Sequence, residues 1–327
     1  MQSIELGSTG LKSTQLGFGC SAVLGRSNRA DSLRALDVAW GEGIRFFDTA
    51  RAYGYGESEA LLGEFLQSRR SQAVIATKFG ILASPQSAWK NAAKNVARKI
   101  VAVAPSVRSL LQKGASTQFS SNMFTIPTLH DSIEESLRKL KTDYVDILLL
   151  HSAPASVLEQ DDLLEAMGRL VEEGKVRVAG LSAEPEVVQL ALDQQTKPLQ
   201  AMQFPCNVFN ISSVGGFTKS TDSRPLLAAN HPYGGAARVR QCRELLLNLL
   251  HGSQLNSTLR DKLATLDSEV LADVVLNVIL RDSGIHVVIP AMMRPEHIRA
   301  NVQAVSNSRF TSLEIKEIRN ALTGTPD

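Results

Sequence analysis

The chain has 327 residues, 43% of them hydrophobic and 21% charged, so it can bury a sizeable core and is neither disordered nor a small disulfide-stapled scaffold. Its 35 basic and 33 acidic residues nearly balance, which gives no overall case for nucleic-acid binding. No run of about 18 apolar residues occurs, so no transmembrane segment is predicted. The charge is nevertheless uneven, because nine basic residues and no acidic one lie between Glu64 and Asp131.

Short apolar runs that alternate with longer helical patterns predict eight strands separated by helices. The expected strands cover 14–20, 45–50, 73–79, 144–151, 176–182, 201–206, 225–232 and 286–292. Helices are expected, among other places, over 30–42, 58–67, 131–140 and 163–173. Nearly continuous apolar strands such as VDILLL are typical of parallel strands covered on both faces. We therefore predict one α/β domain over 1–327, a (β/α)8 TIM barrel with an N-terminal β-hairpin.

Two connections are much longer than the others and must hold inserted segments, one before strand 144–151 and one before strand 286–292. The first contains an insertion at about 81–125, which follows the C-terminal end of a strand and is expected at the active-site end of the barrel. Its apolar residues recur at helical spacing, which predicts a basic amphipathic helix. A lid packed on the barrel, a wall that attracts an anionic substrate and a membrane-surface helix are its three interpretations. The basic residues of this pattern are Lys90, Lys94, Arg98 and Lys99.

The residues 17–22, GFGCSA, match the G-x-G-x-x-G/A fingerprint of dinucleotide-binding folds. A genuine fingerprint opens a helix at once, because the helix N-terminus binds the pyrophosphate. Here Gly25, Ser27 and Asn28 indicate a loop, and the helical pattern resumes only near Ala30. We therefore reject a Rossmann fold.

Four ionisable side chains lie at or just after the ends of neighbouring expected strands, where a barrel places its active site. They are Asp48, Tyr53, Lys78 and His151. A buried aspartate and a buried lysine are costly unless they pair, so we expect an ion pair between Asp48 and Lys78. An ammonium beside a tyrosine favours the phenolate and lowers the tyrosine pKa, which makes Tyr53 a candidate general acid beside a carbonyl. A purely structural role explains each residue singly but not the four together.

Seven stretches in chain order carry a family resemblance: LGSTGLKSTQLGFG, GIRFFDTARAYGYGESEALLG, VIATKFG, SIEESLRKLKTDYVDILLLH, GKVRVAGLS, the strand around Gln203, and VVIPAMMRPEHIRANVQA. With these stretches the sequence resembles the aldo-keto reductase family over essentially its whole length. The resemblance implies a (β/α)8 barrel that binds NADP(H) or NAD(H) without a Rossmann domain. It also implies that the four ionisable residues form a catalytic tetrad, in which tyrosine protonates the carbonyl oxygen as the nicotinamide delivers hydride.

The resemblance further implies contacts to three parts of the cofactor. Asp48 lies near the nicotinamide ribose, and Ser182 and Gln203 bind the nicotinamide carboxamide. A glycine-containing loop meets the pyrophosphate, where free backbone amides suit the anion. The remaining implied contacts are Asn230, His231, Tyr233 and Gly235 in that loop, Ala291 and His297 at the 2′-phosphate, and Asn301 at the adenine.

Departures from the family pattern concern this cofactor site. Ala183 replaces a common asparagine, and Ala291 follows Pro290 where many members have glycine or lysine. Ala291 and His297 also stand where a lysine and an arginine usually clamp the 2′-phosphate, and they make a poorer phosphate site than a guanidinium. The nearby arginines 294 and 299 are substitute candidates. Family habit favours NADP(H) over NAD(H).

We expect an NAD(P)(H)-dependent oxidoreductase acting on a small carbonyl or alcohol substrate, with no nucleic-acid partner. The three widely spaced cysteines form neither a disulfide framework nor a metal-ligand pair, which favours the cytoplasm and no metal site. One alternative is a catalytically idle, cofactor-binding regulatory protein of the same fold, which Ala183 leaves open. Another is a Schiff-base lyase using Lys78, which is disfavoured because a lysine beside Asp48 should stay charged.

Overall fold

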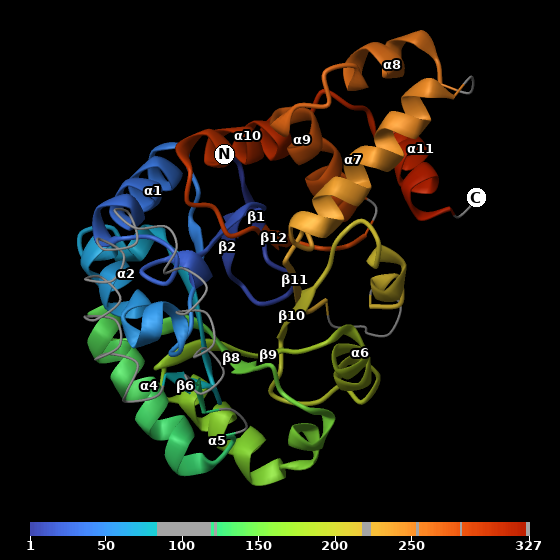
Figure 1. The fold of residues 1–327 in the computed structure, drawn as a ribbon. Coiled ribbons are helices and arrows are strands. Elements are labelled where there is room, and N and C mark those ends of the chain that lie inside the picture. The colour runs from blue at the N-terminus through green and yellow to red at the C-terminus, as the bar shows by residue number, and fades with distance from the viewer. Residues whose placement is uncertain (84–118, 121–122, 218–223, 253–254, 282, 325–327) are drawn as a thin grey trace, which may run out of the picture.

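A computed structural model describes residues 1–83, 119–120, 123–217, 224–252, 255–281 and 283–324. Its largest sheet holds eight parallel strands in the order β3-β4-β5-β8-β9-β10-β11-β12 (Figure 1). Each strand lies within one of the eight predicted ranges, so the predicted strands are confirmed. Their bounds are β3 Gly17–Gly19, β4 Phe46–Asp48, β5 Val74–Phe79, β8 Val145–His151, β9 Val176–Ser182, β10 Ala201–Pro205, β11 Leu226–Asn230 and β12 Val287–Ile289.

The sheet curls until its two edge strands meet. Leu16, just before β3, pairs with Val288 of β12 in an isolated parallel bridge. The Gly19 amide donates to the Pro290 carbonyl at 3.0 Å and joins the same two edges. The fold is therefore a nearly closed (β/α)8 TIM barrel, as predicted.

Gly17 and Gly19, which belong to the rejected dinucleotide-binding pattern, allow the close approaches that the closed barrel requires. A Cβ atom at Gly17 would lie 2.9 Å from the Phe46 ring, and one at Gly19 would lie 3.0 Å from the Pro290 oxygen. A single 3-10 turn follows β3, and the first helix begins only at Arg29. The rejection of a Rossmann fold is confirmed, because no α-helix opens directly after these glycines.

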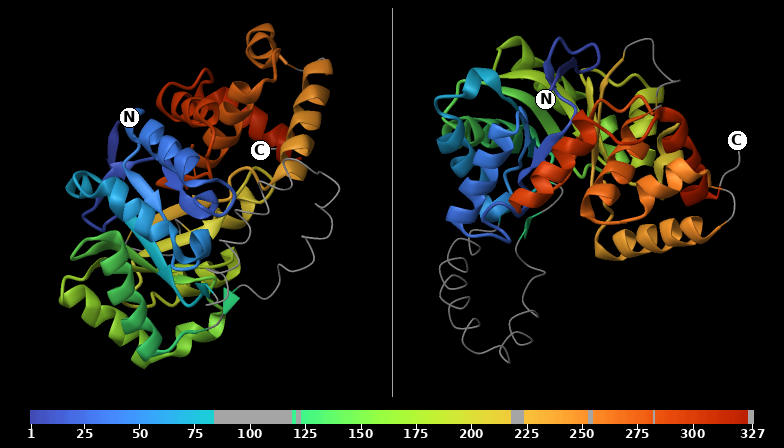
Figure 2. Two further views of the ribbon diagram at one scale, coloured as in Figure 1. Left: turned by 60° about the vertical axis from the view of Figure 1, so that its left-hand side comes forward. Right: turned by 90° about the horizontal axis from the view of Figure 1, so that it is seen from above.

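Helices surround the barrel, and Figure 2 shows part of the long β11–β12 connection, in orange, standing outside this ring. The predicted insertion before the last strand is thus confirmed, and its described residues include the helices α7, α8 and α9. The bounds are α1 Arg29–Gly41, α2 Ser58–Leu66, α4 Ile126–Leu140, α5 Asp161–Glu172, α6 Pro185–Asp193, α7 Ala236–His251, α8 Ser257–Leu263, α9 Ser268–Leu280, α10 Pro295–Ser306 and α11 Ser312–Thr323.

The start of α4 differs from the prediction. The helix begins at Ile126 rather than Asp131, because the Thr125 side chain caps it by accepting from the Thr128 amide and Pro127 occupies its first turn. The acidic residues that suggested a start at Asp131 lie within the helix instead. The end of α5 is as predicted, since Gly174 follows it with a left-handed φ of 73°.

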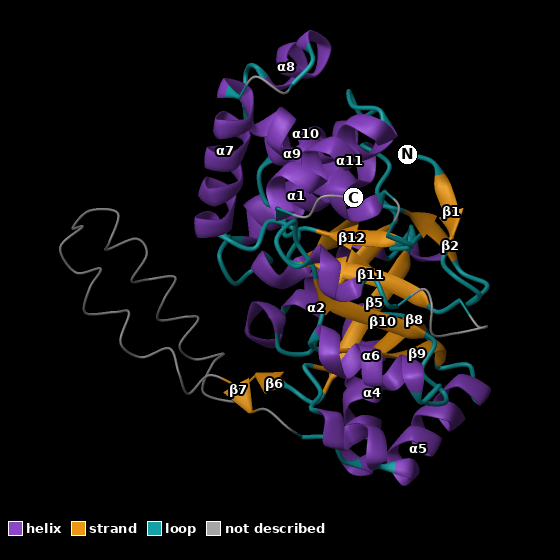
Figure 3. Ribbon diagram, turned by 90° about the vertical axis from the view of Figure 1, so that its right-hand side faces the viewer, coloured by secondary structure: helices purple, strands orange, loops and turns teal. Residues whose placement is uncertain are grey.

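Two short antiparallel pairs mark opposite ends of the barrel (Figure 3). The predicted N-terminal hairpin is present as β1 Ser3–Glu5 and β2 Lys12–Thr14. At the other end, β6 Leu82–Ala83 and β7 Phe119–Ser120 pair at the base of the insertion, and β6 contacts the turn Tyr53–Gly56. The predicted basic helix and its lysines and arginines lie outside the described residues.

The apolar run of β8 is nearly continuous because both faces of this strand are buried. Ile147 and Leu149 pack inside the barrel, whereas Leu148 and Leu150 pack against the surrounding helices. Successive side chains of a strand point to opposite faces, so a strand between two apolar layers needs no polar position. Among the described helices, none is long and apolar enough to cross a membrane.

Candidate active site

Three strand ends and one turn bring the four ionisable residues together. Asp48 ends β4, Lys78 lies near the end of β5, and His151 ends β8, which are neighbours in the sheet. Tyr53 begins the 3-10 turn Tyr53–Gly56 that follows β4. Parallel strands present their C-terminal ends at one end of the barrel, so residues distant in sequence share one site.

Lys78 is the centre of this group and is only 1% exposed. Its Nζ atom donates to Asp48 Oδ1 at 2.6 Å, to the Thr49 carbonyl at 2.8 Å and to the Tyr53 hydroxyl at 3.5 Å. Burial is the largest single effect and favours the neutral amine, but the interactions with Asp48 and Tyr53 together outweigh it and raise the pKa of Lys78. Lys78 therefore stays charged, which argues against Schiff-base chemistry. The Thr49 contact was missed, because no sequence pattern marks a backbone carbonyl.

Tyr53 departs from the prediction in the sign of its pKa shift. Burial disfavours the phenolate and raises the pKa of Tyr53, while the Lys78 ammonium acts in the opposite, predicted direction. Burial is the larger effect, so the tyrosine pKa is raised rather than lowered. Tyr53 is thus protonated at neutral pH, which is the form that a proton donor needs.

His151 lies edge-on to Tyr53, with ring centroids 5.7 Å apart and an interplanar angle of 81°. Burial, followed by the nearby Lys78 charge, lowers the pKa of His151 to about 3. The imidazole is therefore neutral at physiological pH. Its buried Nδ1 atom has no hydrogen-bond partner within the described residues. Because such groups are normally paired, this atom is available to a ligand or an ordered water.

A line of polar side chains continues from Asp48 of β4 to β9, β10 and β11, three adjacent strands. Gln203 of β10 donates to Asp48 Oδ1 at 2.7 Å, and its own oxygen accepts from Ser182 Oγ at 2.9 Å. Asn230, at the end of β11, donates to the same Gln203 oxygen at 3.3 Å. The buried Asn230 Oδ1 has no partner in the described chain. These donors and the free acceptor fit a carboxamide and a ribose, so they suit a nicotinamide nucleoside.

The loop 231–235 and α10 carry the positions implied for the pyrophosphate and adenosine. His231 and Gly235 are exposed and adopt left-handed φ angles of 52° and 87° in the loop that leads into α7. The Tyr233 hydroxyl donates to Asn301 Oδ1, and Asn301 is only 3% exposed. The implied adenine residue is therefore already bonded to the loop. Ala291 and His297 are exposed near the start of α10.

The two substitute arginines differ in their environment. The Arg299 guanidinium lies 3.1 Å from Glu42 Oε1 and is therefore engaged in an ion pair. Arg294 is exposed at the N-cap position of α10 and forms no ion pair within the described part of the chain. Arg294 is consequently the better candidate to meet a 2′-phosphate.

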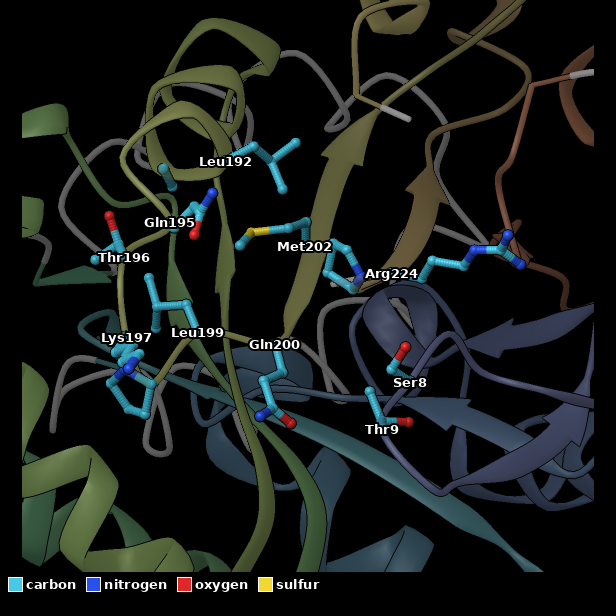
Figure 4. A pocket seen from close by; sticks show the side chains of 13 residues that line it. Ser8, Thr9, Leu192, Gln195, Thr196, Lys197, Leu199, Gln200, Met202 and Arg224 are labelled. Carbon is cyan, nitrogen blue, oxygen red and sulfur yellow. The ribbon is translucent and has the colours of Figure 1, made fainter. Parts of the chain in front are cut away.

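A cavity of about 440 Å³ lies at the opposite end of the barrel (Figure 4). Gln200 precedes β10 and Arg224 precedes β11, so the N-terminal ends of these strands line it together with the hairpin turn. Its apolar wall comes from Leu192, Leu199 and Met202. Since barrel enzymes carry their chemistry at the C-terminal ends of the strands, we do not assign the reaction to this cavity. Among the described residues, no cluster of three metal-ligating side chains occurs.

The aldo/keto reductase family model matches residues 15–323, so the chain belongs to this family of oxidoreductases, which use nicotinamide cofactors. It is 31% identical over 210 residues to Probable aldo-keto reductase 1 of Glycine max, covering 62% of this chain. The match spans about half of that relative, 51% of its length. Uncharacterized oxidoreductase YqkF of Bacillus subtilis (strain 168) is 25% identical over 342 residues, covering 98% of this chain and 96% of that protein.

The solved structure of aldo-keto reductase AKR11C1 from Bacillus halodurans (holo form) superimposes with a TM-score of 0.71. The comparison covers 100% of this chain and 98% of that chain at 21% identity. At this identity the likeness establishes the barrel fold, while the roles of individual residues must come from the geometry of the site.

Proposed function

We propose that this chain transfers hydride between a nicotinamide cofactor and a carbonyl or alcohol substrate, with Tyr53 as the general acid or base. The observation that carries the proposal is the contact of buried Lys78 with both Asp48 and the Tyr53 hydroxyl. A bound nicotinamide supplies or accepts the hydride. The protein supplies the proton, the orientation and the electrostatic environment.

In reduction, the protonated Tyr53 donates its proton to the carbonyl oxygen while hydride adds to the carbonyl carbon, and an alcohol forms. The resulting phenolate is stabilised by the Lys78 ammonium, whose charge Asp48 maintains. In oxidation the phenolate takes the proton back from the alcohol. Neutral His151 is placed to hydrogen-bond the substrate oxygen and orient it toward Tyr53, because the two rings are in contact.

The cofactor residues are part of the same proposal. Asp48, Ser182 and Gln203 hold the nicotinamide ribose and carboxamide, supported by their shared hydrogen bonds. Asn230, which the resemblance implied at the pyrophosphate, is reassigned to the carboxamide because it donates to Gln203. The rest of the cofactor is assigned to the loop residues His231, Tyr233 and Gly235 and to Ala291, His297 and Asn301.

We assign NADP(H) as the preferred cofactor over NAD(H), with Arg294 as the phosphate contact. Replacing Arg294 by alanine should weaken NADPH binding about tenfold and leave NADH binding unchanged, because only NADPH carries the 2′-phosphate. Arg299→Ala is the matched control, since its side chain is held by Glu42. Dissociation constants of both cofactors, measured by nicotinamide fluorescence, test this assignment. A strong preference of the wild type for NADH would contradict NADP(H) as the preferred cofactor.

The substrate is proposed to include anionic carbonyl compounds, supported by the excess of basic residues between Glu64 and Asp131. KM for carboxybenzaldehyde should then rise with salt, whereas KM for uncharged benzaldehyde should not. The cytoplasm is the proposed location, supported by three free, buried cysteines, which suit a reducing compartment.

The test of the main proposal is cofactor oxidation with a panel of aldehydes and ketones. We expect wild-type turnover and a loss of at least about a hundredfold in kcat for Tyr53→Phe, which keeps the ring but removes the proton. If the wild type binds cofactor and turns over no substrate, the idle regulatory alternative is favoured instead.

A further inference from the structure

Behind the loop that carries Tyr53 lies a buried carboxylate that the proposed reaction does not use. Glu59 is in the first turn of α2 and only 1% exposed. Its Oε1 atom accepts hydrogen bonds from Thr77 Oγ1 and Ser136 Oγ, both at 2.7 Å. Removing a carboxylate from water is costly, so its position requires compensating partners.

The second carboxylate oxygen of Glu59 faces Arg51. Arg51 Nη1 lies 3.7 Å from Glu59 Oε2, and the Arg51 side chain is 16% exposed. Within the described residues, neither of these two atoms has a hydrogen-bond partner. Arg51 also lies 3.8 Å from Glu135 of α4. Its charge, together with the positive N-terminal end of α2, compensates the Glu59 charge.

Glu59 thereby joins the two segments that carry the tetrad. Arg51 lies in the loop between Asp48 and Tyr53, and Thr77 directly precedes Lys78 in β5. Successive side chains of a strand point to opposite faces, so Thr77 faces the helix layer while Lys78 faces the barrel interior. Glu59 contacts the outer side of the same backbone whose inner side carries the reaction.

The Tyr53 loop needs such support because its backbone is unusual. Gly54, Tyr55 and Gly56 have consecutive left-handed φ angles of 57°, 59° and 90°. Left-handed backbone at a residue with a side chain persists only where the surroundings hold it. Lys139 of α4 donates to the Gly56 carbonyl and anchors the far end of the loop. The Arg51–Glu59 pair anchors the near end.

We propose that Glu59 is a positioning residue, which acts through Arg51 and Thr77 to hold the Tyr53 hydroxyl within reach of Lys78. This inference rests on the proposed function, because it assigns Glu59 to the reaction in which Tyr53 transfers the proton. It needs no contact between Glu59 and the substrate or cofactor.

The test replaces Glu59 by glutamine, which keeps an acceptor for Thr77 and Ser136 but removes the charge that faces Arg51. We expect kcat to fall about tenfold while the cofactor dissociation constant stays within about twofold, because displacement of a reacting group lowers the rate without removing a binding contact. Glu64→Gln is the matched control, since Glu64 is in the same helix but forms an exposed ion pair with Arg29. The control should retain wild-type kcat.

A second variant makes the test independent of the stability of the first. Arg51→Gln should lower kcat by a similar factor, and the double variant should lose no more than either single variant, because both act through one contact. A wild-type kcat per folded molecule in both single variants, with only a lower Tm, would show a merely structural role and overturn the proposal. Independent, multiplying losses would also overturn it.

An absorbance titration separates this inference from the proposed reaction. The Tyr53 ionisation is obtained as the difference between each protein and its Tyr53→Phe partner. Loss of Glu59 should let the hydroxyl move away from Lys78 and raise its pKa further, while Glu64→Gln leaves it unchanged. If the wild type turns over no substrate, the proposed function fails, and this titration still tests the positioning. An unshifted titration in Glu59→Gln would exclude it.

Discussion

Burial and charge act in opposite directions on the pKa values of Lys78 and Tyr53 and in the same direction on that of His151. At Lys78 the interactions with Asp48 and Tyr53 together outweigh burial and keep the ammonium, whereas burial outweighs the Lys78 charge at Tyr53 and keeps the proton. The outcome is a charged lysine beside a protonated tyrosine and a neutral histidine. This set of protonation states is suited to carbonyl reduction near neutral pH.

The pH dependence of turnover follows from these shifts. Reduction needs protonated Tyr53, whose pKa lies above its ordinary value of 10.0, so the reduction rate should stay level through neutral pH and fall only in strongly alkaline buffer. Oxidation needs the phenolate and should rise over the same alkaline range. Because the pKa of His151 is lowered to about 3, no inflection is expected near its ordinary value of 6.5. Profiles of kcat in both directions measure this, and an inflection near 6.5 that His151→Asn abolishes would contradict it.

Among the elements, helix packing depends on close approaches that periodicity does not reveal. Gly63 lies where α2 crosses α4, and a Cβ atom there would be 2.5 Å from the Lys139 carbonyl oxygen. Gly168 in α5 looks equivalent in sequence, but a Cβ atom there would meet only Pro198 at 3.8 Å. The two glycines are alike as helix residues and differ only in their neighbours.

Alanine substitutions should therefore act with opposite signs. Gly63→Ala forces the α4 backbone to move, and we expect it to lower the free energy of unfolding by about 1–3 kcal/mol. Gly168→Ala has ordinary contacts and reduces the freedom of the unfolded chain, so it should raise that free energy by about 0.5–1 kcal/mol. Urea unfolding of both variants measures the difference, and equal effects would refute the packing argument.

Across the whole molecule, two buried aspartates mark opposite ends of the barrel. Asp48 pairs with Lys78 at the C-terminal ends of the strands. Asp146, only 1% exposed near the start of β8, lies 2.8 Å from Arg70 and 3.0 Å from Arg177. Both aspartates are buried, but only Asp48 lies at the end where barrels carry their chemistry.

Substitutions at the N-terminal end of the barrel should therefore lower stability alone, whereas those at the C-terminal end should lower both stability and activity. Asp146→Asn leaves Arg70 without its buried charge partner and should cost about 3–5 kcal/mol of unfolding free energy, with kcat unchanged below the new melting temperature. Lys78→Met should cost a similar free energy and also abolish most turnover. Chemical unfolding and steady-state kinetics on both variants test this, and a large loss of kcat in Asp146→Asn would speak against the separation.

The strands, their order of appearance and the four ionisable residues at or just after strand ends could be predicted, because apolar periodicity and the position of a residue relative to a strand end are local properties. The single-domain assignment and the roles of the site residues stay predictions, and the basic helix lies in the part of the chain that is not described. The start of α4 was predicted wrongly although its signal is local, because the Thr125 cap and Pro127 mark the helix start and the acidic residues lie within the helix.

Other features depended on contacts between distant segments. Gln203 reaches Asp48 from 155 positions away, Gly17 and Gly19 close the barrel against β12, and Tyr233 bonds Asn301 of another element. The direction of the pKa shift of Tyr53 also depends on such contacts, because it is set by how deeply the folded chain buries the hydroxyl. The amino-acid order thus determined which chemical groups stand at the strand ends. Their partners and protonation states were set only when folding brought them together and removed water, since burial and charge–charge energies depend on three-dimensional surroundings.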